Sequence, residues 1–317
     1  MENIYSNIFS FNKKILKKTI KALNKGNLAA LPTETVYGLA GNAYSKYSIN
    51  NIYRLKKRPK FNPLIIHYYG YKQILDDVVV NDNFMKLYKE FCPGPITFIL
   101  KRKLNSKIQP SACAKLKSVA VRFPKHRITR SILKKIKYPL AMPSANIFSN
   151  ISPVCALDVY DEFKKKIHII INGGQSKIGI ESTVIDLTNK PKILRPGKIE
   201  ISKLEKILKV KIKKNNKGIK IKSPGMLKKH YSPGIPVLIN QKKSDNKSAF
   251  IYLGNKYKNK DKFFSLSKVS NLNEAAANLY KIFRKIKKKG FKKIQIVKIS
   301  QRGIGAAIND RIKKASN

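Results

Sequence analysis

Polar segments with hydroxyl, carboxylate and cationic side chains recur along the first part of the chain, and chemistry would take place there. The first reads LPTETVYGLA from Leu31 to Ala40 and puts two threonines and a glutamate directly after the apolar run Leu28 to Leu31. Ligands of α/β sheets bind near the carboxyl ends of strands, so these side chains are well placed to hold a polar ligand. A polar turn without a ligand would have the same composition, and both interpretations stay open.

The second segment is cationic: Lys56-Lys57-Arg58-Pro59, followed by Asn62-Pro63-Leu64. A lysine point charge and a bidentate arginine fork both suit phosphate oxygens. The stop at Pro59 returns the chain into a strand, which would bring Lys56 and Arg58 to the strand ends that the threonine segment follows. Cations also offset the dipole at a helix C-terminus, so that simpler explanation remains.

Three further segments carry small polar groups. PSAN at 143–146 offers the hydroxyl of Ser144 and the amide of Asn146, which suit nucleotide oxygens or the cap of a helix. The other two are Gly173-Gly174 with Glu181-Ser182-Thr183, and LRPG at 194–197. Each segment alone is a weak indication of function.

Apolar periodicity predicts the elements that must position these segments. Helices are expected at 12–24, 48–58 (capped by Ser48 and ended by Pro59), 84–91, 131–136 and 202–208. Strands are expected at 28–31, 64–67, 96–100, 119–123, 169–171 and 183–187. This mixture predicts an α/β domain with a largely open, twisted mixed sheet.

The last third of the chain has a different pattern. Residues 210–223 read VKIKKNNKGIKIKS, which is typical of a linker. Strands at 237–239, 250–253 and 294–299 and helices at 275–286 and 304–313 then predict a small Rossmann-like α/β domain. We therefore divide the chain into a catalytic domain at 1–208, a linker or lid at 209–234 and a C-terminal domain at 235–317.

The charge of the chain is strongly positive. Lysine and arginine total 68 against 17 acidic residues, a formal net charge of +51. Such a field attracts polyanions, which favours RNA binding. However, the excess is mainly lysine spread along the whole chain beside many isoleucines and asparagines, as an AT-rich genome would produce, so charge alone does not decide the function.

Other classes of protein fit the sequence poorly. No apolar run reaches the length of a membrane span, and the N-terminus lacks the pattern of a signal or transit peptide, so a cytoplasmic protein is expected. Cys92, Cys113 and Cys155 are too sparse for a disulfide scaffold or a zinc ribbon. Three histidines lack the spacing of metal ligands: His126, His168 and His230. We expect them to have surface or hydrogen-bonding roles.

Taken in order, the polar segments resemble the YrdC-like family of threonylcarbamoyl-AMP synthases. The shared marks are PTETVYGL at 32–39, K-x-R-P at 56–59, NPL at 62–64, PGP-x-T at 93–97, AVR at 120–122, PSAN at 143–146, GG at 173–174, ESTV at 181–184 and LRPG at 194–197. The resemblance continues with SPGM…KHYSP at 223–233 and RGIGAAINDRIKKA at 302–315, which indicates the longer, two-domain type. Asp310 departs mildly from the family, which often has asparagine there.

The resemblance implies two neighbouring binding sites in one cleft. The threonine site would comprise Thr35, His67, Arg122 for the carboxylate, the backbone of Met142, and Ser182. The ATP site would comprise Arg58, Asn62, Ser118, Ser144, Asn146, Ser152, Arg195 and Tyr231, the last closing over the nucleotide from the linker. Lys56 and Arg58 would be the catalytic cations, and Glu34 and Glu181 are either helpers or structural.

The reaction that the resemblance implies joins L-threonine, bicarbonate and ATP into threonylcarbamoyl-AMP and diphosphate, for the t6A modification of tRNA. No acidic cluster marks a protein metal site, so Mg²⁺ is expected to arrive on the ATP phosphates. The product would pass to a tRNA threonylcarbamoyltransferase, and direct binding of tRNA or double-stranded RNA is a further expectation. The alternatives are a non-enzymatic RNA-binding protein of the same fold, or a carbamoyl-transfer domain of the hydrogenase-maturation kind, which would need zinc-finger and acylphosphatase-like segments that this sequence lacks.

Overall fold

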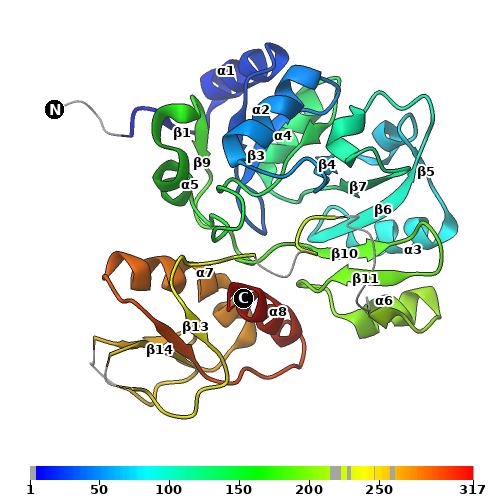
Figure 1. Cartoon of the computed structure of the whole chain (residues 1–317). Helices are drawn as coiled ribbons and strands as arrows, with labels where there is room; N and C mark the ends of the chain where they lie inside the picture. The colour runs from blue at the N-terminus through cyan, green and yellow to red at the C-terminus, as the bar shows by residue number, and fades with distance from the viewer. Residues whose placement is uncertain (1–4, 215–222, 227–229, 246, 258–260, 317) are drawn as a thin grey trace.

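Two separate β-sheets organise the chain (Figure 1). The computed structural model describes residues 5–214, 223–226, 230–245, 247–257 and 261–316. The first sheet has twelve strands in the order β1-β9-β2-β3-β8-β4-β7-β6-β10-β11-β12, and β5 pairs with β6. Its strands are β1 (Ile8–Ser10), β2 (Ala29–Leu31), β3 (Gly38–Asn42), β4 (Ile65–His67), β5 (Val78–Val79), β6 (Ile96–Arg102), β7 (Ser118–Arg122), β8 (Leu140–Ala141), β9 (Ile170–Asn172), β10 (Thr183–Asp186), β11 (Lys192–Arg195) and β12 (Lys213–Lys214). Both parallel and antiparallel pairs occur in this sheet, which confirms the mixed sheet.

Six α-helices accompany this sheet within the described residues: α1 (Lys13–Asn24), α2 (Lys46–Lys56), α3 (Asp82–Phe91), α4 (Arg127–Lys135), α5 (Ala156–Phe163) and α6 (Ile201–Leu208). The predicted cap of α2 was wrong by one turn. Ser45 caps the helix by accepting from the Ser48 N–H, whereas the Ser48 hydroxyl donates to the Gly26 carbonyl from inside the helix. Helix α4 also begins earlier than predicted, because the His126 ring accepts from the Ile128 N–H and serves as its cap.

Strand alternation gives the centre of the sheet two different faces. One carries polar as well as apolar side chains and is called the polar face below, and the other is apolar. On one face Ile65 lies opposite Ala120, and His67 lies opposite Arg122, across β4 and β7. The residues between them point the other way, into an apolar core built with α2 and α3 from Ile66, Val121, Phe98, Ile52, Phe84 and Leu87. The core therefore fixes which face His67 and Arg122 occupy.

The second sheet is smaller and wholly parallel. Its strands are β13 (Val237–Leu238), β14 (Ala249–Tyr252), β15 (Phe263–Ser265) and β16 (Ile294–Ile296), in the order β13-β16-β14-β15. Helices α7 (Leu272–Lys288) and α8 (Gly305–Ala315) lie between this sheet and the first domain (Figure 1). This arrangement confirms the expected small α/β domain at the C-terminus.

The two domains share one apolar cluster. Val36, Ile151 and Ile180 of the first domain join Leu279 and Phe283 of α7 in it. The backbones also come very close, since a Cβ on Gly179, whose φ is +76°, would lie 2.5 Å from the Ala277 Cα. Only glycine fits both that conformation and that space.

The first sheet extends past the predicted end of the catalytic domain at residue 208, because β12 pairs with β11. The division of the chain at residues 208 and 234 remains a prediction. Much of the predicted linker, at 215–222 and 227–229, lies outside the described residues. Among the described residues, no helix combines the length and apolar character that crossing a bilayer requires.

Candidate active site

A buried pocket lies over the polar face of the first sheet, where β3, β8, β4 and β7 are neighbours. It encloses about 40 Å³, which is room for a few water molecules. His67 and Arg122 do end their strands, as the sequence predicts for a ligand site. However, Met142 approaches from β8, which is antiparallel to β4, so the pocket lies on the face of the sheet rather than beyond one edge.

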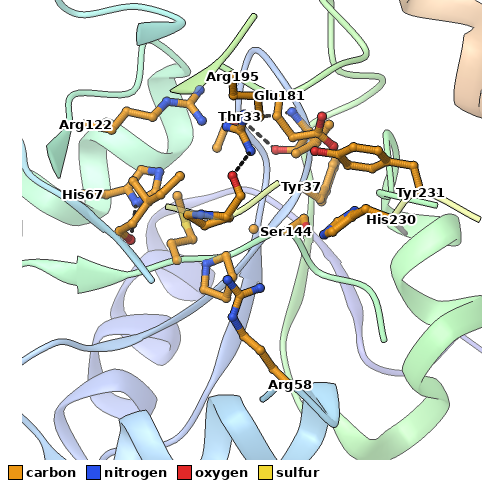
Figure 2. Close-up of a pocket in the computed structure, with 16 residues that line it drawn as sticks. Thr33, Tyr37, Arg58, His67, Arg122, Ser144, Glu181, Arg195, His230 and Tyr231 are labelled. Atoms are coloured by element: carbon orange, nitrogen blue, oxygen red, sulfur yellow. Dashed lines mark hydrogen bonds between the residues drawn. The ribbon is translucent and has the colours of Figure 1, made fainter. Parts of the chain in front are cut away.

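Most of the predicted site residues meet at this pocket. Seven line it directly: Arg58, His67, Arg122, Met142, Ser144, Arg195 and Tyr231. Five more donate to or accept from a lining residue: Thr35, Lys56, Asn62, Ser152 and Ser182. Figure 2 shows the side chains of Arg58 and Arg122 pointing toward the middle of the pocket from opposite sides, with His230 and Tyr231 on a third side.

Arg122 is held from one side. Its Nη2 donates to Glu34 Oε1 at 2.6 Å and to Thr35 Oγ1 at 2.8 Å, while the Thr33 and Thr35 hydroxyls are 2.9 Å apart. Its Nε is buried and has no hydrogen-bond partner within the described part of the chain. A buried donor without a partner is costly, so this guanidinium suits an anionic ligand.

His67 lies beside Arg122 and is fully buried. Burial and then the Arg122 charge lower its pKa well below the usual range, so the imidazole is neutral at neutral pH. Its Nδ1 lies 3.1 Å from the Ile65 carbonyl oxygen, within hydrogen-bond distance. The ring therefore adds no second positive charge to this side of the pocket.

Arg58 enters from the opposite side. Its Nε donates to the Asn62 carbonyl at 2.9 Å, and its Nη2 donates to Asn62 Oδ1 at 2.5 Å and to the Pro63 carbonyl at 2.8 Å. Burial lowers the pKa of Arg58 to about 10, which leaves it charged at neutral pH. The buried Asn62 Nδ2 has no hydrogen-bond partner among the described residues, so it is a second donor, beside the Arg58 guanidinium, that a ligand could use.

Lys56 does not reach the pocket, contrary to the expected contact with phosphate. Its Nζ donates to the Ser144 carbonyl at 2.5 Å and to the Asn146 carbonyl, and its own carbonyl accepts from the Phe148 N–H. Burial and then the Arg58 charge lower the pKa of Lys56 well below its usual range. Because backbone oxygens take up its N–H groups, Lys56 supports the loop that carries Ser144 and Asn146.

Two other predicted residues stand apart from the pocket. Asn146 Nδ2 donates to the Ile147 and Asn150 carbonyls inside its own loop. Ser118 is on the same face as Arg122 but at the other end of β7, about 13 Å along the strand. It lines a separate cavity with Lys101, Lys103 and Lys115, because β7 carries the two residues to opposite ends.

The third guanidinium, of Arg195, joins the sheet to the linker. Its Nε donates to the Ser182 carbonyl at 3.0 Å, its Nη2 to Ser182 Oγ at 3.1 Å, and its Nη1 to the Pro224 carbonyl at 3.4 Å. Ser182 Oγ also lies 2.7 Å from Thr97 Oγ1. Arg195 is therefore positioned by its own sheet while it touches the segment that covers the pocket.

His230 and Tyr231 complete the cover. His230 does not lie on the surface, one of the two roles expected for it: its ring is buried between Phe148 and Tyr231, and its Nδ1 has no partner in the described part of the chain. Burial, opposed by Glu181 and reinforced by Arg58, lowers the pKa of His230 to about 3. The Tyr231 hydroxyl is also buried without a partner there, so two residues that line the pocket each carry a buried polar atom without a hydrogen bond.

Glu181 is a lining residue whose partners come from both domains. It accepts from Ser152 Oγ at 2.6 Å, from Arg311 Nε at 2.7 Å and from the Tyr280 hydroxyl at 3.2 Å. The Arg311 guanidinium also lies 5.1 Å from the centre of the Tyr231 ring. Tyr280 of α7 and Arg311 of α8 thus hold Glu181 at the pocket, a contact that no local sequence pattern indicates.

Several lining residues were not predicted as ligands: Thr33, Val36, Tyr37, Gly38, Ile65, Pro143, Pro224 and His230. Most of them lie next to predicted residues inside the same motifs, so motif membership was the available indication. His230 stands directly before Tyr231 in KHYSP, and only the absence of metal-ligand spacing argued against it.

The chemistry of the pocket is that of an anion site. Arg58, Arg122 and Arg195 converge there, and the nearby carboxylates of Glu34 and Glu181 are already paired with arginines. Among the described residues, no group of three or more histidines, cysteines and carboxylates is arranged to hold a metal ion. These N–H donors suit phosphate and carboxylate oxygens rather than a cation.

Known proteins match the chain over nearly its full length. A family model described as Telomere recombination, named for Sua5, YciO and YrdC, matches residues 21–197. A second, described as Threonylcarbamoyl-AMP synthase, C-terminal domain, matches residues 199–317. The threonylcarbamoyl-AMP synthase of Pyrococcus abyssi is 35% identical over 93% of this chain and 92% of that relative, and the Bacillus subtilis protein of the same name is 35% identical over 73% and 68%.

Solved structures agree with these matches. The crystal structure of P. abyssi Sua5 complexed with L-threonine has a TM-score of 0.90 to this chain, at 32% identity, over 98% of this chain and 97% of the other. The resemblance inferred from the motifs is thereby confirmed. The chain belongs to the family of threonylcarbamoyl-AMP synthases, in its two-domain Sua5 type.

Proposed function

We propose that this chain is the nucleotidyltransferase that converts L-threonine, bicarbonate and ATP into threonylcarbamoyl-AMP and diphosphate. The observation that carries the proposal is the convergence of Arg58, Arg122 and Arg195 in one buried pocket, since all the substrates carry negatively charged groups. The names of the relatives, and the threonine bound to the P. abyssi structure, support the same reaction.

In this proposal Arg122 binds the threonine carboxylate through the nitrogens that Glu34 and Thr35 leave available. His67, the backbone of Met142 and Ser182 complete that site, as the family resemblance implies. The neutral threonine amine attacks bicarbonate, forms a C–N bond and releases water, which gives an N-carboxylate. A carboxylate oxygen then attacks the α-phosphorus, and the bond from that phosphorus to diphosphate breaks.

The nucleotide lies on the other side of the pocket. Arg58 and Arg195 neutralise the phosphates, with Asn62, Ser144, Asn146, Ser152 and Tyr231 as further ATP contacts. Positioning and charge neutralisation carry most of the rate in such a transfer. Ser118 contributes only if the nucleotide extends along β7 to its far end. Mg²⁺ enters as part of the ATP substrate, because the pocket offers donors for oxygen and not a cluster of carboxylates.

The linker serves as a lid in this scheme. A cavity of about 40 Å³ is far too small for a nucleotide, so Pro224, His230 and Tyr231 must move to admit ATP. Their return would exclude water from the reactive adenylate.

Release of diphosphate from ATP by the purified chain tests the proposed function. We expect release only when threonine and bicarbonate are both present. Equal release without threonine would show ATP hydrolysis of another kind and would contradict the proposal.

Arg122→Ala is expected to raise the apparent KM for threonine about 100-fold with little change in the KM for ATP. The reason is that a hydrogen bond to a charged group contributes about 1.5–3 kcal/mol and only threonine would lose it. Steady-state kinetics with each substrate varied in turn measures both constants. Equal shifts in the two constants would show that Arg122 does not bind the threonine carboxylate.

RNA binding is a second candidate function, favoured by a surface without acidic residues. Helices α1 and α4 pack against each other, and neither contains an aspartate or glutamate. None of their side chains forms an ion pair within the described part of the chain. The exposed cations of this surface are Lys13, Lys14, Lys17, Lys18, Lys21, Lys25, Lys125, Arg127, Lys134, Lys135 and Lys137.

A titration with double-stranded RNA and with tRNA at several salt concentrations tests this second function. Lys17→Glu with Lys134→Glu should weaken binding and flatten its salt dependence. Lys281→Glu with Lys285→Glu, on the exposed face of α7, changes the net charge equally and serves as the control. Equal losses in both double variants would assign the binding to net charge and not to α1 and α4.

The product of the proposed reaction is a mixed anhydride of a carbamic acid and AMP, which is an activated donor for a transferase. We propose that this transferase is the tRNA threonylcarbamoyltransferase of t6A synthesis. A cytoplasmic location belongs to the same proposal, and the three unpaired cysteines fit a reducing compartment.

A further inference from the structure

Glu34 is an acidic residue next to a pocket whose proposed ligands are all anions. Its side chain is only 11% exposed, and it does not line the pocket itself. Its Oε1 accepts from Arg122 Nη2 at 2.6 Å, and its Oε2 accepts from the Lys125 backbone N–H at 3.0 Å. A carboxylate beside an anion site lowers the affinity of that site for anions, because like charges repel. The presence of Glu34 therefore needs a physical explanation.

The contacts of Arg122 supply the reason. The Nη2 of its guanidinium donates both to Glu34 and to Thr35. Because the guanidinium is planar and rigid, fixing Nη2 fixes the plane and the direction of Nε. That Nε is buried and has no partner among the described residues. The Glu34 contact therefore lies on one side of the group and leaves the pocket side open.

The backbone on both sides holds Glu34 in place. Thr33 Oγ1 donates to the Val36 carbonyl at 2.6 Å, which closes the turn on which Glu34 stands. The Lys125 N–H fixes the second carboxylate oxygen from the turn between β7 and α4. Although burial would raise the pKa of Glu34, the Arg122 charge and hydrogen bonds lower it, so the carboxylate is ionised at neutral pH.

We propose that Glu34 is a positioning residue that orients Arg122 for the substrate carboxylate and does not itself touch substrate. This inference rests on the proposed function, in which Arg122 binds threonine. Both carboxylate oxygens of Glu34 already accept hydrogen bonds, from Arg122 Nη2 and from the Lys125 N–H, which argues against a role as a base or as a ligand of the threonine amine.

Kinetics of three variants test the role. Glu34→Ala should raise the apparent KM for threonine about tenfold and leave the KM for ATP within twofold of wild type. Glu34→Gln should give a smaller rise, because its amide oxygen can still accept from Arg122 Nη2. Glu162→Gln is the matched control, since Glu162 is also paired with an arginine, Arg284, but outside the pocket.

A double variant decides whether Glu34 acts through Arg122. Adding Glu34→Ala to Arg122→Ala should cause no further rise in the KM for threonine, because residues that act as a unit are not additive. A further tenfold rise would show that Glu34 contacts substrate and would overturn the inference. A fall in melting temperature with both KM values unchanged would also overturn it, as it would show a structural role only.

The wild-type chain separates this inference from the proposed function. If its diphosphate release does not saturate with threonine, the proposed function fails, and the inference fails with it. If wild type saturates and Glu34→Ala and Glu34→Gln keep the wild-type KM for threonine, only the inference fails.

Discussion

Replacing Arg58 by alanine is expected to lower kcat/KM for ATP by about 10²–10³-fold, the cost of removing one preorganised group that stabilises transition-state charge. Arg58 is 6% exposed and is held by the Asn62 and Pro63 oxygens, so its guanidinium is already oriented toward the pocket before ATP arrives. Steady-state diphosphate release measures the loss, and circular dichroism verifies that the variant is folded.

Arg54→Ala is the matched control for this variant. Arg54 lies on α2, four residues before Arg58, is exposed, and donates to Asn51 Oδ1. It should keep wild-type turnover, whereas Arg58→Lys, which keeps the charge and loses the fork, should fall between the two. Wild-type turnover in Arg58→Ala would refute the role of Arg58 at the phosphates.

Replacing Arg311 by methionine is expected to have the largest effect on stability. Arg311 is fully buried, and its Nε donates to Glu181 Oε2 at 2.7 Å across the domain interface. Removing one partner of a buried ion pair leaves an uncompensated charge and costs about 3–5 kcal/mol. We expect the melting temperature to fall by roughly 10 °C, with loss of turnover because Glu181 forms a wall of the pocket.

The double variant Arg311→Met with Glu181→Gln is the control, because it removes both charges. It should recover much of the lost stability while turnover stays low. An equal melting temperature in wild type and Arg311→Met would show that the ion pair does not join the domains.

The same pair predicts a dependence of stability on pH. Burial alone would raise the pKa of Glu181, but Arg311, Arg195 and Ser152 hold it at about 2, below the ordinary 4.5. A depressed pKa stabilises the fold at pH values above 4.5, and this contribution is lost as the pH falls from 4.5 toward 2. Denaturant unfolding between pH 5 and pH 2 should therefore show a steeper decline in wild type than in Glu181→Gln.

The sequence predicted elements well where periodicity and caps were strong. Helix α1 was found within one residue, since Asn12 caps it and Ile15, Thr19 and Leu23 form its buried face. Strands β3 and β8 were missed, because GLAGN is unusually small for a strand and β8 has only two residues. Helix α5 was missed as well.

The motifs predicted which residues form the site, but not the hydrogen bonds and ion pairs between those residues. The family resemblance implies one cleft for Arg58, His67, Arg122 and Arg195, and all four side chains line the pocket. The role of Lys56 was missed, because its carbonyl partners come from a loop about 90 residues away that packing alone brings near. Glu181 and Arg311 are 130 residues apart in the sequence and belong to different domains, so no local sequence pattern predicts that they pair.

The central claim is tested most directly by following two labels into one product. The purified chain is incubated with threonine, [¹⁴C]bicarbonate and ATP labelled at the α-phosphorus, and the products are separated by chromatography. The proposed reaction predicts a single new species that carries both labels and forms only when threonine is present. A species that carries the phosphorus label without carbon from bicarbonate, such as a threonyl adenylate, or no new species at all, would contradict it.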